Sequence, residues 1–438
     1  MQRMTALDPM RYLSETIGPR GSTTEEEAKA AEYVAMQLTN LGLAPQRDAF
    51  LSAASAYAPY ALFTGMLLLS LFLFWQPQPV GAAAAAILTL TALVSVLLEL
   101  LFRTNPLRWL LPLGDSQNVY VRIPREDAQR AGGLPADPVA KDADNTKVAG
   151  PANTIYITAH LDTHRTPLVF SSPGWIKTFG LIMPAALVSA GVSLLLFIVG
   201  VFSTSLIWRE VALVPGVVML FILILMIQAD RTDYSPGADD NASGVAATLG
   251  LAERLAHTPL KNTDVVVVFT GCEEVGCYGA DAFFQRHAEE TRGATLLVID
   301  QVGAANAKPS VVEGERFLAF VRSDPHLLAL AHKVLDEHPE WQAGFTLSNA
   351  PYGELSVGVK DGLHCIALGH SENSPSYWHT MLDTMQHADP ELVEREQELA
   401  WQLLKAIDAV HAPNGSSVTL THGPAERGTA VNGDPCTA

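Results

Sequence analysis

Several acidic and imidazole side chains follow short apolar runs in this sequence. In chain order these groups are His160 with Asp162, Asp239-Asp240, Glu273-Glu274, Asp300 and His379. Carboxylates and imidazoles are side chains that bind Zn²⁺ in proteins. The residue types therefore indicate a metal site in which groups far apart in the sequence meet.

The spacing predicts where these groups meet. His160 and Asp162 stand two residues apart at the end of an alternating apolar run, so on an extended backbone both side chains leave the same face. Glu273-Glu274 follow a β-branched run typical of a strand buried on both faces, and Asp300 follows another. An open α/β sheet places its site at the carboxyl ends of its strands, where we expect these groups to lie.

The charges of the groups suit two zinc ions. Three carboxylates and one bridging hydroxide balance four positive charges, and neutral imidazoles complete the ligand set. A water made acidic by two metals attacks a carbonyl at neutral pH, and a nearby glutamate moves its proton to the leaving amine. The predicted chemistry is hydrolysis of an amide bond.

Five motifs occur in a fixed order: H-x-D, G-A-D-D-N-A-S-G, G-C-E-E-x-G, V-I-D and Y-W-H-T-x-x-D-T. In this order they resemble the zinc aminopeptidase family of co-catalytic di-zinc exopeptidases, which includes bacterial leucyl aminopeptidases and, more distantly, glutamate carboxypeptidase. The resemblance covers the soluble parts of the chain from Leu7 to His411. It implies an α/β fold with a mixed, largely parallel sheet flanked by helices.

The resemblance also implies two zinc ions per chain, held by His160, Asp240, Glu274, Asp300 and His379. Asp240 would bridge the ions, with His160 and Asp300 on one and Glu274 and His379 on the other.

Two further acids receive roles from the same resemblance. Glu273 would be the general base, and Asp162 would orient His160. The peptide bond Asp240-Asn241 would be cis. Other histidines near the motifs, among them His164 and His370, need no metal role.

Alternative functions remain open at this stage. The first is a membrane-anchored zinc metallopeptidase, an aminopeptidase, because the ligand at position 300 is Asp as in the aminopeptidases that the chain resembles. A carboxypeptidase, or a single-zinc glutaminyl-cyclase-like transferase, shares the fold. A non-catalytic membrane receptor is the third class, and the intact ligand set argues against it. Relatives usually carry S/T-D-H where this chain has Asn349 to Glu354, which leaves the preferred substrate open.

The bulk composition narrows the choice of partners. The chain has 438 residues, 48% of them hydrophobic, which is enough for a large core. Its formal net charge of −18 argues against nucleic acid as a partner. The four cysteines show neither zinc-finger spacing nor a disulfide framework. We expect a peptide substrate and a lipid bilayer as partners, and no signal peptide, because the amino end is polar.

Two long apolar stretches interrupt the soluble sequence. No charged residue occurs from Ala49 to Leu98, and within that stretch residues 57–75 and 80–102 are each long enough to cross a bilayer. Residues 178–208 and 211–229 form a second such pair. The sequence therefore predicts four transmembrane helices in two hairpins.

These stretches divide the chain. We expect a discontinuous peptidase domain and two transmembrane hairpins, followed by a disordered tail: the domain comprises 1–50, 113–175 and 229–411, the hairpins 57–102 and 176–228, and the tail 412–438. The polar segment from Glu126 to Asn153 is expected to be a flexible loop.

The second hairpin separates His160 from Asp240, so both of its ends must emerge on the side of the membrane where these residues meet. Among the basic residues near the hairpins, only Arg209 lies at a hairpin tip. Five basic residues flank the peptidase side: Arg47, Arg103, Arg108, Lys177 and Arg231. Cytoplasmic loops carry an excess of Lys and Arg, so the peptidase domain is predicted to face the cytoplasm.

A reporter fusion tests this orientation. Green fluorescent protein fused at the carboxyl end should fluoresce, and alkaline phosphatase fused at the same position should be inactive, because the former folds in the cytoplasm and the latter requires export. Active phosphatase together with a dark fluorescent fusion would reverse the topology.

Overall fold

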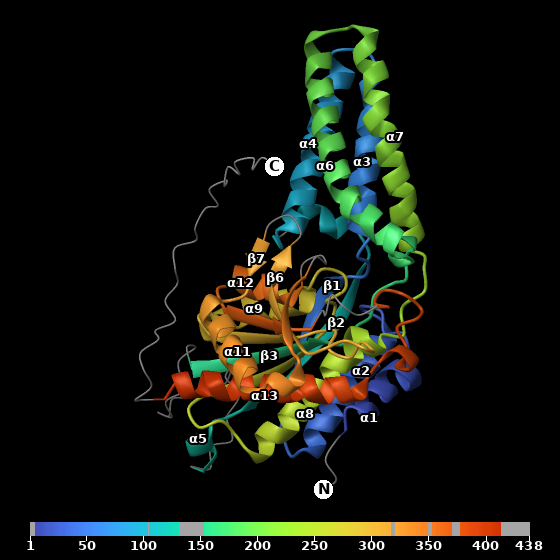
Figure 1. Cartoon of the computed structure of the whole chain (residues 1–438). Helices are drawn as coiled ribbons and strands as arrows, with labels where there is room; N and C mark the ends of the chain where they lie inside the picture. Colours follow the sequence, from blue (N-terminus) through green and yellow to red (C-terminus); the bar gives the residue numbers. More distant parts are fainter. Residues whose placement is uncertain are drawn as a thin grey trace, which may run out of the picture.

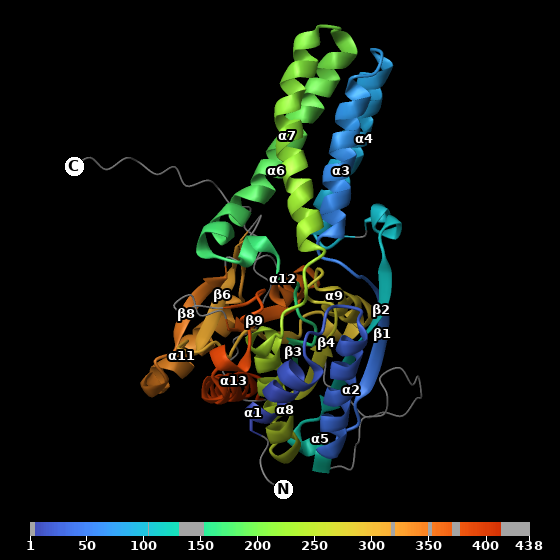
Figure 2. The same cartoon turned by 90° about the vertical axis from the view of Figure 1, so that its right-hand side faces the viewer.

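The computed structural model describes residues 5–103, 105–130, 153–316, 320–348, 353–369 and 377–412. One sheet with helices on both faces forms the main body, and a bundle of four long helices stands on one end of it (Figures 1 and 2). The predicted tail beyond Ala412, most of the predicted loop after Arg130, and His370 lie outside the described residues.

The sheet is mixed. Its strands are β1 (Gln46–Ala53), β2 (Leu113–Ile123), β3 (Thr154–His160), β4 (Asp264–Thr270), β5 (Thr295–Ile299), β6 (Ser310–Arg316), β7 (Phe320–Arg322), β8 (Gly344–Ser348) and β9 (His364–Leu368). They are ordered β1-β2-β4-β3-β5-β9-β6-β7, with β8 paired to β6. The central strands β4, β3, β5 and β9 run parallel, while β1, β2, β6 and β7 pair antiparallel along the order. This confirms the predicted fold class.

The central strands end level with one another. In the pairing of β3 with β4, His160 lies opposite Thr270, and in the pairing of β5 with β9, Ile299 lies opposite Leu368. Every residue of these four strands is buried, as expected for parallel strands covered on both faces. The groups that follow them therefore share one edge of the sheet.

Helices cover both faces because successive strand side chains point in opposite directions. On β3, Ile155 and Ile157 belong to one core and Tyr156 to the other. The first core also contains α2 (Glu25–Asn40), α8 (Gly244–His257), α11 (Pro325–Glu337) and α13 (Pro390–Val410); α9 (Tyr278–Arg286) and α12 (Glu354–Lys360) belong to the second. The short helices are α1 (Leu7–Arg11), α5 (Glu126–Arg130) and α10 (Ala288–Thr291). The prediction of a loop beginning at Glu126 was wrong for α5, which forms one helical turn before the segment that is not described.

The bundle consists of α3 (Ala58–Phe74), α4 (Val80–Leu100), α6 (Pro173–Phe202) and α7 (Leu206–Ala229). Both α3 and α6 pack against α4 and α7. Among the described residues, three helices are long and apolar enough to cross a membrane: α4, α6 and α7. The prediction of four such spans needs correction, because the 17 residues of α3 extend only about 26 Å, less than the roughly 30 Å of a hydrocarbon core.

The outer surface of the bundle is apolar. Phe72, Val188, Leu195, Val214 and Val217 are each between 62% and 68% exposed. A patch of this kind is rare on soluble proteins and typical of a membrane or protein contact. The tips of the two hairpins also touch, since Arg209 donates a hydrogen bond from Nη2 to the backbone carbonyl of Gln76 at 3.1 Å.

Glu396 on α13 is a buried acid far along the chain from the metal motifs. Its Oε1 accepts a hydrogen bond from the backbone N–H of Ser310 at 2.8 Å, and its Oε2 has no partner among the described residues. Burial raises the pKa of Glu396 to about 8. The folded protein therefore holds this proton more tightly than the unfolded chain does.

This raised pKa predicts a pH-dependent stability. The protonated Glu396 side chain contributes to the free energy of unfolding. This contribution is complete below about pH 4.5 and is lost as the pH rises toward about 8. Glutamine does not titrate, so the Glu396→Gln variant does not lose stability in this way. The difference in Tm between the variant and the wild type should therefore be at least ~3 °C more favourable to the variant at pH 8.5 than at pH 5. Glu394→Gln, at an exposed position of the same helix, is the control. Parallel Tm curves for wild type and Glu396→Gln would contradict the prediction.

Candidate metal centre

The first half of the site forms around His160, the last residue of β3. Its Nε2 lies 3.2 Å from Oδ1 of Asp240 and 3.2 Å from Oδ1 of Asp300. Its Nδ1 lies 3.2 Å from the backbone carbonyl oxygen of Asp162 and 3.5 Å from Oδ1 of the same residue. A ring that donates from Nδ1 to Asp162 keeps the Nε2 lone pair for the space between the two carboxylates.

The second half forms around His379. Its Nε2 lies 3.1 Å from Oε2 of Glu274 and 3.3 Å from Oδ2 of Asp240. Asp240 therefore presents one carboxylate oxygen to each histidine. The five residues predicted as metal ligands lie together in these two groups.

Asp240 belongs to a turn over Ala238–Ser243, between α7 and α8. The peptide bond Asp240-Asn241 is cis, as the resemblance implied. The preceding Gly237 has φ +63°, and a Cβ there would lie 2.2 Å from Cγ2 of Thr163. Only glycine allows the turn to approach the end of β3 so closely.

The rest of this motif joins the turn to the end of β5. Asn241 donates from Nδ2 to the carbonyl of Ile299 at 3.1 Å, and its Oδ1 accepts from the N–H of Gln301 at 3.2 Å. Ser243 Oγ accepts from the N–H of Val302 at 3.0 Å. These bonds fix Asp300, a predicted ligand, relative to Asp240.

Asp162 holds the loop that carries the glutamate pair. Its Oδ1 accepts from the backbone N–H of Glu273 at 3.0 Å, and its Oδ2 accepts from that of Glu274 at 3.1 Å. Ser22 Oγ donates to the same Oδ2 at 2.6 Å. The carboxylate thus positions both glutamates, a role beyond the predicted contact with His160.

Asp383, within the last motif, likewise holds the backbone of Asp239 and Asp240. Its two oxygens accept from the backbone N–H groups of Asp239 and Asp240 at 2.7 and 3.1 Å. Asp239 in turn accepts from the N–H of Gly303 at 2.8 Å. Asp383 and Asp239 are therefore occupied by backbone donors, whereas the side chain of Asp240 faces the histidines.

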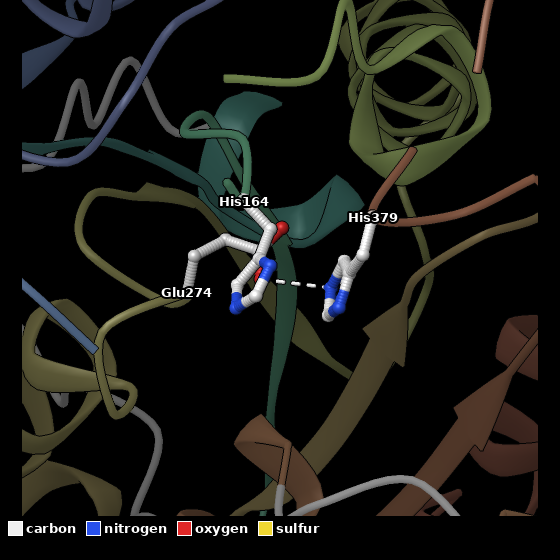
Figure 3. A group of neighbouring side chains, drawn as sticks. All are labelled: His164, Glu274 and His379. Carbon is white, nitrogen blue, oxygen red and sulfur yellow. Dashed lines mark ion pairs between the residues drawn. The ribbon is translucent and has the colours of Figure 1, made fainter. Parts of the chain in front are cut away.

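His164 stacks on His379 with ring centroids 3.6 Å apart, and Figure 3 shows both rings beside Glu274. Atoms of the three residues lie within 4.8 Å of one another, as metal ligands would. However, Nδ1 of His164 lies 2.7 Å from the carbonyl of Arg165, and Nε2 lies 3.2 Å from the hydroxyl of Tyr57. Both nitrogens have partners, so His164 supports the ring of His379.

The residues present fit a divalent metal. Among the described residues, Glu274 Oε1 and His379 Nδ1 are buried atoms without a hydrogen-bond partner. Such atoms are rare unless an ion or water satisfies them. Two groups with the expected ligand types lie side by side, His160 with Asp240 and Asp300, and His379 with Glu274 and Asp240. Carboxylate oxygens and imidazole nitrogens form a donor set suited to Zn²⁺.

The buried carboxylates of the site repel one another, which shifts their pKa values. Burial raises the pKa values of Glu273 and Glu274 well above the usual range, and the neighbouring carboxylates add to this effect. Burial acts in the same direction on Asp240, but hydrogen bonds from His160 and His379 lower its pKa. A divalent cation would relieve this repulsion.

Four residues outside the predicted ligand set proved to be structural supports: Arg20, Ser22, Glu27 and Asp383. The Arg20 guanidinium is 1% exposed and donates to the carbonyls of Leu161 and Gly237, both at 3.0 Å. Glu27 accepts from the N–H of Cys272 at 2.8 Å. Asp383 is the aspartate of the motif Y-W-H-T-x-x-D-T, so the sequence could have indicated its role in the site. The other three residues lie in segments without such a motif.

Comparison with known proteins agrees with this geometry. The family described as "Peptidase family M28" matches residues 222–404, which include Asp240, Glu274 and His379 but not His160. A "Probable zinc metalloprotease" of Pyrenophora tritici-repentis is 35% identical over 97 residues, covering 22% of this chain and 22% of that protein. A "Probable lipoprotein aminopeptidase" of Mycobacterium tuberculosis is 27% identical over 187 residues, covering 36% and 37% respectively.

Among solved structures, a leucine aminopeptidase precursor of Bacteroides thetaiotaomicron has a TM-score of 0.50 with 13% identity, covering 92% of this chain and 97% of that one. At this identity the likeness supports the fold alone. The matched stretches span less than half of either sequence relative. Residues 222–404 of the chain are therefore similar to peptidase family M28, and the chain has the fold of zinc exopeptidases.

Proposed function

We propose that the chain is a membrane-anchored zinc exopeptidase with two zinc ions, which removes amino-terminal residues from peptides. The observation that carries the proposal is the position of Asp240 between His160 and His379, with one oxygen toward each ring. Asp300 and Glu274 complete the two groups. A bridging carboxylate with a histidine and a second acid on each side is the arrangement expected for a pair of metal ions.

Zinc, when bound, polarises a carbonyl oxygen and lowers the pKa of water. Glu273 is placed to move a proton beside it, because its carboxylate shares a group with Glu274 and His160. Its Oε1 accepts from Cys277 Sγ at 3.1 Å, and its backbone is fixed by Asp162. We assign Glu273 as the general base and Asp162 as the residue that positions it.

The preference for amino ends is supported by the relatives, among them the M. tuberculosis protein named as an aminopeptidase. Asp at position 300 points the same way, as in the family that the motifs resemble. A carboxypeptidase or a single-zinc transferase of the same fold are the alternatives that the following experiments separate.

The membrane anchor is also part of this proposal. The hairpins 57–102 and 176–228 would hold the discontinuous domain of 1–50, 113–175 and 229–411 at the bilayer, on the cytoplasmic side. The long apolar helices α4, α6 and α7 and the apolar outer surface of the bundle support an anchor.

Peptides with free and blocked ends test the reaction. The detergent-purified protein should release single residues from free amino ends, should spare acetylated peptides, and should stop when a chelator removes zinc, since the metal supplies the electrophile. Mass spectrometry of the products is the measurement. Loss of residues from the carboxyl end would establish a carboxypeptidase, and no cleavage by zinc-loaded protein would contradict the peptidase.

The Glu273→Gln variant tests the base. It should retain about two zinc ions per chain, measured by elemental analysis, while kcat falls by roughly 10²–10⁴, the range typical of lost general-base catalysis. Glu289→Gln, an exposed glutamate of the same region, should keep both zinc and activity. A Glu273→Gln protein that turns over at close to the wild-type rate would remove Glu273 from the mechanism, and a zinc count near one would favour the transferase.

A further inference from the structure

One cavity contains both the proposed metal ligands and side chains of the helix bundle. Its volume is about 1580 Å³, including the part open to solvent. At one end lie Asp240, Glu273, Glu274, Asp300 and His379. At the other end every helix of the bundle contributes, including Phe63 of α3, Leu100 of α4, Ala186 of α6 and Met226 of α7.

The cavity extends well into the bundle. On α6 the lining residues run from Phe179 to Ala186, and on α7 they begin at Ile222, seven residues before the helix ends at Ala229. Seven residues of helix correspond to a rise of about 10 Å. If α4 and α7 cross a bilayer, this depth is about a third of the roughly 30 Å hydrocarbon core.

Contacts between aromatic rings connect the two ends. The ring of Phe170 lies 4.7 Å from that of His379, 4.9 Å from that of Trp378 and 5.2 Å from that of Phe179 on α6. Figure 2 shows the first turns of α6 leaning away from the other helices, toward the side of the domain that carries β6. The metal site thus opens toward apolar side chains of the bundle.

The charged groups at the base of the bundle are paired with one another. Glu99 accepts from the Tyr278 hydroxyl, lies 3.5 Å from Nη2 of Arg108, and accepts from Nδ2 of Asn105 at 3.0 Å. The Arg108 guanidinium also lies 4.1 Å above the Tyr278 ring. Among the described residues only Nε of Arg108 in this group is buried without a hydrogen-bond partner. The charge of Glu99 is thus balanced by Arg108, so the bundle end of the cavity is suited to an apolar ligand.

We propose that the bundle end of the cavity binds an apolar stretch of the substrate, so that the substrates are peptides whose free end adjoins a run of apolar residues. Such peptides partition into a bilayer, and the helices would receive the stretch while the terminal residue lies at the metal site. The proposal rests on the proposed exopeptidase function and names the substrate class for that site.

The test compares two peptides with the same free amino-terminal leucine, followed either by five leucines or by alternating serine and glycine. The full-length protein in proteoliposomes should favour the apolar peptide in kcat/KM. Ala186→Phe fills the bundle end and should lower this preference at least about tenfold, an effect expected for pocket contacts of this size. Val188→Phe, on the lipid-facing side of the same helix and 65% exposed, should keep the wild-type preference.

A second variant guards against misfolding of Ala186→Phe. Met226→Ala enlarges the cavity and should shift the preference toward a run of phenylalanines. Ile224→Ala, at a 57% exposed position of the same helix, should not. Equal preference for all peptides in the wild type, or the same shift in the lining and outward-facing variants, would overturn the proposal.

Photocross-linking reads out binding without turnover. An apolar peptide with a diazirine on its third residue should cross-link to lining residues such as Phe179, Ala186, Ile222 or Met226, as mapped by mass spectrometry, and the polar peptide should not compete. Such cross-links without any hydrolysis would refute the exopeptidase but retain the apolar site. Cross-links confined to outward-facing residues such as Val188, or a diacyl lipid probe that occupies the cavity and resists displacement by peptide, would overturn the proposal.

Discussion

The concentration of acids at one sheet edge is the constraint on which the site depends. Asp162, Asp239 and Asp383 accept backbone N–H groups, and each of these bonds fixes a loop that carries a proposed ligand or the proposed base. Glu274 keeps a buried oxygen that has no donor among the described residues, and Asp240 faces His160 and His379. The carboxylates thus divide into those that hold the backbone and those proposed to face a metal, and adjacent residues such as Asp239 and Asp240 differ in this respect.

A buried cation completes this arrangement from the other side. Arg20 contacts carbonyls of the segment after β3 and of the turn before Asp240, which are far apart in the sequence. Burial lowers the pKa of Arg20 to about 10, yet the acids Asp383 and Asp162 favour its charged form. The guanidinium remains ionised at neutral pH and joins, through their backbones, two segments that carry predicted ligands.

Much of this could be predicted because buried parallel strands leave a strong pattern. The β-branched runs predicted β4 and β5, and the level ends of the strands bring His160 and Asp300 together. The supports Ser22 and Glu27 could not be found in the same way. Ser22 donates to the carboxylate of Asp162 and Glu27 accepts from the backbone N–H of Cys272, and both contacts depend on the folded path of the loops. The length of α3 was overestimated because hydropathy does not mark where a helix begins.

The insertion of α6 and α7 between β3 and α8 also determines the order in which the site is made. A ribosome synthesises His160 first, then the whole second hairpin, and only afterwards Asp240, Glu274 and His379. His160 therefore meets Asp240 only after the second hairpin has been synthesised and has brought the chain back to the end of β3. A nascent chain that ends within this hairpin lacks every other predicted ligand, so the proposed metal site can form only late in synthesis.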